Sequence, residues 1–185
     1  MKKIIVMTMA MLAMAFAFSS CGSDDDDVPG GGSSSANEVR RVYIFDNGSE
    51  YYNRQYKLTV GSETKIIKIG DSDLKKISAA PSAVEIEAGS SLESAKKDGK
   101  TLNVYSYDIP ATMHGAATLT LECSLKDGEL PEKVWILFGG YIGVGSGDNV
   151  NAKGQLFYMG GLAKDLVKDY IDRRNGTTLG NCVLK

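Results

Sequence analysis

Apolar and polar residues alternate along residues 117–126, and this is the clearest pattern in the chain. One face carries Ala117, Leu119, Leu121, Cys123 and Leu125, and the other face is polar. A period of two is typical of an antiparallel strand with one buried face. Asp127-Gly128 follows directly and indicates a turn.

Shorter runs of β-branched and aromatic residues between turn signals predict further strands. Residues 134–138 are apolar on both faces, as expected of a central strand. Short helical turns are predicted at 71–77 and at 92–97, the second after the capping-box pair Ser90 and Glu93. The predicted strands cover 41–45, 51–60, 64–69, 83–87, 101–109, 117–126, 134–138, 155–159 and 178–184.

Residues 162–174 have the spacing of an amphipathic helix. Apolar residues, including leucines and Tyr170, recur every three or four positions. Asn175-Gly176 follows and indicates the C-terminal end of the helix. The sum is a β-rich fold, mainly an antiparallel β-sandwich, with one C-terminal α-helix packed on a sheet. Eight strands, a helix and a ninth strand also resemble the lipocalin order. A lipocalin-like barrel is therefore the alternative, in second place because the only tryptophan is Trp135, far from the first strand.

The N-terminal segment has the features of a secretory leader. Lys2 and Lys3 precede an apolar stretch, and small residues lead up to Cys21. This arrangement resembles the lipobox of bacterial lipoproteins. The resemblance implies that residues 1–20 are a signal peptide and that Cys21 carries acyl chains.

The residues after Cys21 are acidic. They resemble the export tag of Bacteroidota surface lipoproteins, which implies a position on the exterior face of the outer membrane. The alternative is an ordinary solvated acidic tail. Residues 21–36 would then form the lipidated, acidic and flexible tether, and residues 37–185 a single domain. The residues of the tag are Ser23, Asp24, Asp25, Asp26 and Asp27.

Charge argues against nucleic acid as a partner. The chain of 185 residues has 21 basic and 23 acidic residues, and leaving out Lys2, Lys3 and the four tag aspartates gives 19 of each. A balanced domain has no electrostatic footprint for a polyanion. One histidine and three cysteines also favour neither a metal centre nor a cofactor.

Catalytic constellations are sparse. His114, the single histidine, lies in a predicted loop, and no Gly-x-Ser-x-Gly motif is present. Glu85 and Glu87 share one face of a predicted strand, about 7 Å apart along the backbone. That spacing is found in inverting glycosidases. The simpler interpretation is that both glutamates face water while Val84 and Ile86 face the core.

The glycine-rich run 139–147 lacks the following helix that a phosphate-binding loop requires. It predicts a hairpin loop whose bare backbone could admit a ligand ring. Tyr141 in this loop is therefore the first candidate for ligand binding. Asp148, Asn149 and Asn151 offer oxygen ligands for calcium, but their spacing favours a polar turn.

Other tyrosines are weaker ligand-binding candidates. Tyr105 and Tyr107 share a strand face, and a second group lies at Tyr51, Tyr52 and Tyr56. Aromatic faces on a rigid sheet can stack on sugars or form protein interfaces. The alternative is cross-strand packing.

Two cysteines remain once Cys21 is assigned to lipid. In an oxidising compartment Cys123 and Cys182 predict a disulfide, with two separate buried thiols as the alternative.

These observations predict a non-catalytic outer-membrane surface lipoprotein whose β domain binds an extracellular glycan or protein. The glycan rests on analogy with nutrient-capture systems of such bacteria. One alternative is a structural or interaction subunit of an envelope or adhesin complex. Another is a carboxylate-based hydrolase.

Overall fold

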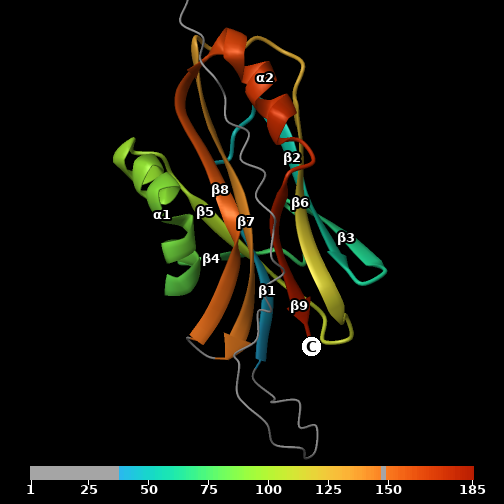
Figure 1. Ribbon diagram of the computed structural model, residues 1–185. Helices are drawn as coiled ribbons and strands as arrows, with labels where there is room; N and C mark the ends of the chain where they lie inside the picture. Colours follow the sequence, from blue (N-terminus) through green and yellow to red (C-terminus); the bar gives the residue numbers. More distant parts are fainter. Residues whose placement is uncertain (1–37, 147–148) are drawn as a thin grey trace, which may run out of the picture.

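The chain folds into two antiparallel sheets and two helices (Figure 1). The structure is a computed structural model, and it describes residues 38–146 and 149–185. The five-stranded sheet has the order β4-β5-β1-β7-β8, and the four-stranded sheet the order β3-β2-β6-β9. The strands are β1 Glu38–Asp46, β2 Tyr52–Val60, β3 Glu63–Lys68, β4 Lys75–Ile77, β5 Asn103–Asp108, β6 Gly115–Leu125, β7 Lys133–Ser146, β8 Asn149–Ala163 and β9 Thr178–Leu184. The helices are α1 Ser82–Lys97 and α2 Lys164–Arg174.

The main core lies between the two sheets. Alternate residues of each strand point into it, so that Val42 and Ile44 of β1 meet Leu119 and Leu121 of β6 in one buried cluster. The sheets come together along β8 and β9, where the Gln155 side-chain amide donates to the carbonyl oxygen of Thr178 at 3.3 Å. Two sheets sharing a core agree with the sandwich-like prediction.

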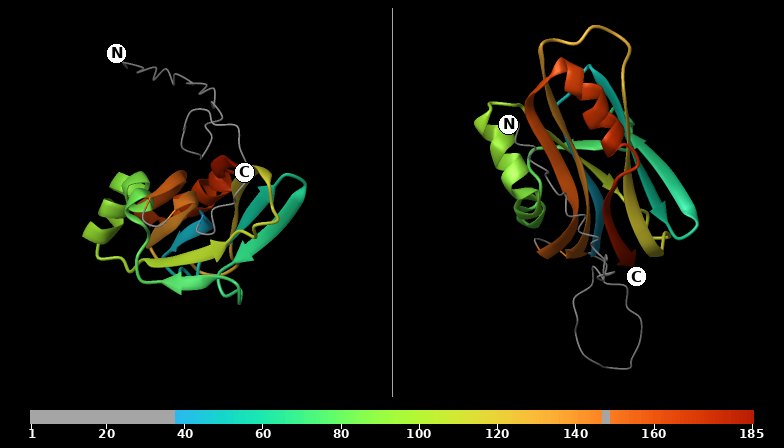
Figure 2. Two further views of the ribbon diagram at one scale, coloured as in Figure 1. Left: turned by 90° about the horizontal axis from the view of Figure 1, so that it is seen from below. Right: turned by 45° about the horizontal axis from the view of Figure 1, so that its top comes forward.

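The helices cover different parts of this body (Figure 2). α1 lies on the outer face of the five-stranded sheet, where it packs mainly against β8 and β7. α2 packs across β6, β8 and β7, and its Val167 and Ile171 enter the main core. Among the described residues no helix is long and apolar enough to cross a membrane.

The predicted C-terminal helix is confirmed as α2, although 162 and 163 belong to β8. The helical turn predicted at 92–97 is confirmed as the end of α1, the first half of this helix was not predicted, and the strand predicted at 83–87 is wrong. The buried residues of α1 recur every three or four positions, as in an amphipathic helix, and they are Val84, Ala88, Leu92 and Ala95. Ile86, expected in the core, is 76% exposed.

Two loop or turn predictions are also wrong. Residues 75–77 of the helical turn predicted at 71–77 form β4. The glycine-rich run lies largely inside β7, because its glycines permit close strand packing rather than a loop. A Cβ on Gly139 would lie 2.7 Å from Leu156 Cα, and one on Gly145 only 1.9 Å from the carbonyl oxygen of Asn149.

Candidate functional site

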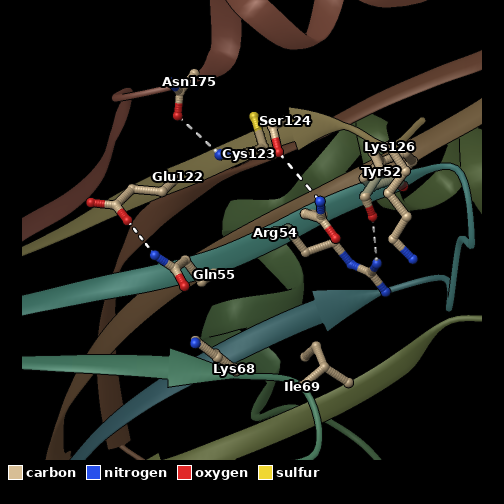
Figure 3. A pocket seen from close by; sticks show the side chains of 11 residues that line it. Tyr52, Arg54, Gln55, Lys68, Ile69, Glu122, Cys123, Ser124, Lys126 and Asn175 are labelled. Carbon is tan, nitrogen blue, oxygen red and sulfur yellow. Dashed lines mark hydrogen bonds between the residues drawn. The ribbon is translucent and has the colours of Figure 1, made fainter.

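A polar groove of about 690 Å³ runs over the four-stranded sheet (Figure 3). It crosses β2 and β6 and reaches the end of β3 and the turn after α2. The residues that line it are Tyr52, Asn53, Arg54, Gln55, Lys68, Ile69, Glu122, Cys123, Ser124, Lys126 and Asn175.

Strand register places the polar side chains of the groove. β2 and β6 pair so that Gln55 lies opposite Glu122 and Asn53 opposite Ser124. The Gln55 amide donates to the Glu122 carboxylate at 2.5 Å, and the Asn53 amide donates to the Ser124 hydroxyl at 3.4 Å. Along β2 these outward polar residues alternate with inward residues such as Tyr52. The outward polar residues of β2 and β6 therefore form the floor of the groove.

The turn after α2 closes one side of the groove. The Asn175 side-chain oxygen accepts a hydrogen bond from the backbone N–H of Cys123 at 3.0 Å. Lys68 and Lys126 contribute ammonium groups, and neither forms an ion pair among the residues that the structure describes. Glu122 is the only carboxylate in the lining, so the groove has a small excess of positive charge.

A second hollow of about 560 Å³ adjoins the groove at Gln55 and Lys68. It is lined by the edge strand β3 and by the loop that follows, including Asp71 and Asp73. Lys65 pairs with Asp73 at 2.7 Å, and this bond lowers the pKa of the Asp73 carboxyl. The polar surface therefore continues to the edge of the sheet.

A buried ion pair fixes the end of β2 beneath the groove. Asp46 is fully buried, and its carboxylate accepts from the Arg54 guanidinium and from the backbone N–H of Gly48. The Tyr52 hydroxyl lies 3.1 Å from both the carbonyl oxygen and the N–H of Leu137. Burial raises the pKa of Tyr52 to about 12. These contacts tie the beginning of β2 to β1 and β7 beneath the groove.

The groove presents amides, a carboxylate, a hydroxyl and ammonium groups. Together they offer both hydrogen-bond donors and acceptors, which a hydroxyl-rich or extended polar ligand requires. Within residues 38–146 and 149–185 no cluster of three or more His, Cys, Asp or Glu could hold a metal ion. The arrangement suits recognition of a polar molecule.

The proposed role of Tyr141 is wrong. Tyr141 is fully buried under α1, with its ring edge-on to Phe45 at 5.8 Å between centroids. Burial raises the pKa of its hydroxyl, which has no hydrogen-bond partner among the described residues. It packs the outer core and offers no surface to a ligand.

Tyr105 and Tyr107 share the inward face of β5, so the packing alternative is confirmed for this pair. Tyr107 is buried, with the Lys65 ammonium 5.7 Å from its ring centroid. Tyr52 and Tyr56 are likewise buried in the main core.

The predicted disulfide is wrong. Cys123 and Cys182 are both buried, but no bond joins them. Cys182 pairs in register with Ala117, six residues along β6 from Cys123. Six strand residues span about 20 Å. A disulfide requires Cα atoms within about 7 Å.

The remaining candidates do not gather into a site. Glu85 and Glu87 lie on α1, where residues two apart point in different directions. The His114 imidazole Nδ1 lies 2.9 Å from the carbonyl oxygen of Lys185 at an exposed position. Asn149 and Asn151 belong to β8, so the polar turn predicted there is wrong for these two residues.

Several predictions fall outside the described residues. These are the signal peptide at 1–20, the tether at 21–36, and the assignments of Cys21, Ser23, Asp24, Asp25, Asp26, Asp27 and Asp148.

Apart from Tyr52, a weaker ligand-binding candidate, and Cys123, assigned to a disulfide, the residues of the groove were not identified from the sequence. Their one signal was the polar half of the alternation along β2 and β6, which is common to any half-exposed strand. Only the register brings Gln55 opposite Glu122, and only the path of the turn after α2 brings Asn175 beside them.

The fold and the groove define a β-rich, two-sheet domain with an open polar groove on its four-stranded sheet. Comparison with protein-family models, curated proteins and solved structures found no match.

Proposed function

We propose that this chain is a non-catalytic lipoprotein of the bacterial outer membrane, anchored through Cys21 and facing the exterior. In this proposal its sandwich-like domain captures an extracellular glycan in the polar groove. The observation that carries the proposal is the groove itself, where donors and acceptors from three strands lie together on one sheet. The pattern around Cys21 supports the location.

The charge of the groove favours a glycan with acidic groups. Lys68 and Lys126 are unpaired cations in the described part of the chain, and Glu122 is held by Gln55. An acidic sugar would supply the counter-charge, and its hydroxyls would use Asn53 and Ser124. Because Tyr52, the one aromatic residue of the lining, is fully buried, hydrogen bonds and charge would provide the affinity.

A thermal-shift screen of residues 37–185 with neutral and uronic-acid oligosaccharides tests this function. A ligand at 100 times its Kd adds about 2.7 kcal/mol, which raises Tm by several degrees in a domain of this size. Lys68→Gln removes an unpaired cation and Ser124→Ala removes a hydroxyl of the lining, so each should reduce that shift. Lys57→Gln and Thr120→Ala make the same kinds of change on β2 and β6 outside the groove, and they should keep the shift.

If no saccharide shifts Tm, or if the groove and control variants respond alike, the glycan proposal fails.

A subunit of an envelope complex is the second candidate. β3 and β4 end their sheets, and in the part of the chain that the structure describes each pairs on one side only. Such edges accept a strand from a partner. Recovery of one stoichiometric partner from solubilised outer membrane, lost when Ile66 of β3 is replaced by proline, would favour this function over glycan capture.

A further inference from the structure

A separate cleft of about 320 Å³ lies along one side of α2. Leu162 and Leu166 form an apolar part, and the Tyr170 ring continues it. Leu166 is 51% exposed, although large apolar side chains in the described residues are otherwise mostly buried. The cleft shares no lining residue with the polar groove.

Arg174 lies at the end of this cleft and is held in place by aromatic rings. Its guanidinium carbon is 4.5 Å from the Phe157 ring centroid and 5.1 Å from that of Tyr170. Its Nε is buried with no hydrogen-bond partner in the described residues. Within those residues Arg174 also forms no ion pair. The guanidinium is therefore positioned without a counter-charge.

The neighbouring charges of α2 are already compensated. Arg173 binds Asp169, the one carboxylate in the lining of the cleft, and this bond lowers the pKa of Asp169. Lys168 binds Asp172 in the same way one turn away. An incoming anion would therefore meet Arg174 as the single uncompensated charge of the cleft.

We propose that this cleft binds a small amphiphilic carboxylate. The carboxylate would lie on the guanidinium of Arg174, which offers paired N–H donors in a planar fork. The apolar body, a few carbon atoms long, would lie against Leu162 and Leu166. Charge complementarity selects this occupant over a neutral or cationic amphiphile, and the inference does not depend on glycan binding in the groove.

Titration of residues 37–185 with hexanoate, followed by amide NMR, tests the proposal. Shifts should concentrate on residues 162–174, and hexylammonium at equal concentration should leave these signals in place. Arg174→Gln should weaken binding of hexanoate at least tenfold. Lys168→Gln removes an equal charge from the same helix away from the cleft, and it should change the affinity less than twofold.

Three results would overturn the proposal: no local shifts with hexanoate, equal shifts with hexylammonium, or equal losses in the two variants. Arg174→Lys serves as the variant if Arg174→Gln loses its dispersed spectrum, and it should weaken binding while keeping part of it. Leu166→Ser, at an exposed position, should independently weaken binding if the apolar body lies where we propose.

Discussion

Asp46 and Arg54 form the most enclosed ion pair of the described residues. Asp46 is fully buried, and the Arg54 side chain is 10% exposed. A pair of this kind is costly to desolvate, and its carboxylate needs every hydrogen bond that it receives. The ion pair holds the turn between β1 and β2 in place, and Arg54 also donates to the carbonyl oxygen of Ser49 in this turn at 2.9 Å.

Asp46→Ala should lower the free energy of unfolding by about 3–5 kcal/mol, because it leaves a buried guanidinium uncompensated. Asp108→Ala is the matched control. Asp108 binds Arg41 and Lys75, but both pairs are partly exposed to solvent, and their loss should cost less than about 1 kcal/mol. Urea denaturation of both variants measures the difference, and equal losses would contradict the structural role of the buried pair.

Ionisation of Tyr52 should lower the free energy of unfolding at alkaline pH. Burial raises its pKa from 10 to about 12, so the folded state keeps a proton that the unfolded state loses first. The contribution of the protonated Tyr52 to the free energy of unfolding is complete below pH 10, and it disappears as pH rises from 10 to 12. In that window this group adds a slope of at most about 1.4 kcal/mol per pH unit.

Tyr52→Phe should make the alkaline limb of the stability curve shallower, as measured by urea unfolding at pH 8 to 12. Tyr56 and Tyr141, whose pKa values burial also raises, should leave a residual slope. An unchanged slope in Tyr52→Phe would show that this phenol ionises equally in both states.

At the scale of elements, α1 is two helical segments joined at Gly89. Gly89 has φ +41° and ψ −126°, which a residue with a side chain adopts only with strain. The break falls directly before Ser90, where the capping-box spacing predicted a helix start. The second half of α1 was therefore visible in the sequence, and the first half was hidden by an alternation typical of strands.

Gly89→Ala should destabilise the protein by about 1–3 kcal/mol through backbone strain. Among the described residues, no atom apart from the chain neighbours and the backbone of α1 itself lies within 4 Å of the added Cβ, so a clash would not contribute. Ser94→Ala, at an exposed position of the same helix, should be close to neutral. Thermal or urea unfolding measures both, and a neutral Gly89→Ala would mean that α1 can straighten without cost.

At the scale of the whole molecule, the proposed anchor sets where the domain works. Cys21→Ala should move the protein from the membrane fraction to the soluble fraction, because acyl chains would no longer hold it. Replacing Asp24–Asp27 with asparagine should keep it lipidated but protected from protease added to intact cells. If the asparagine form is still cleaved, the export-tag hypothesis is wrong.

Local patterns determined much of the fold. The alternation at 117–126 gave β6, and the helical periodicity at 162–174 gave α2, since each buries one face at its own period. Local patterns failed at 83–87, because five residues fit a strand as well as a helix and burial against β8 decides between them.

The sequence by itself determined a β-rich domain with a late helix, since periodicity is a local property. Only the tertiary structure decided that Cys123 and Cys182 lie six residues apart along the paired strands β6 and β9, that Tyr141 is buried under α1, and that Arg174 lies over the rings of Phe157 and Tyr170. The groove belongs to the same group, because Gln55 and Glu122 are 67 positions apart and meet only through pairing register. Register and packing depend on contacts between residues that are far apart in the sequence, and local sequence patterns do not predict these contacts.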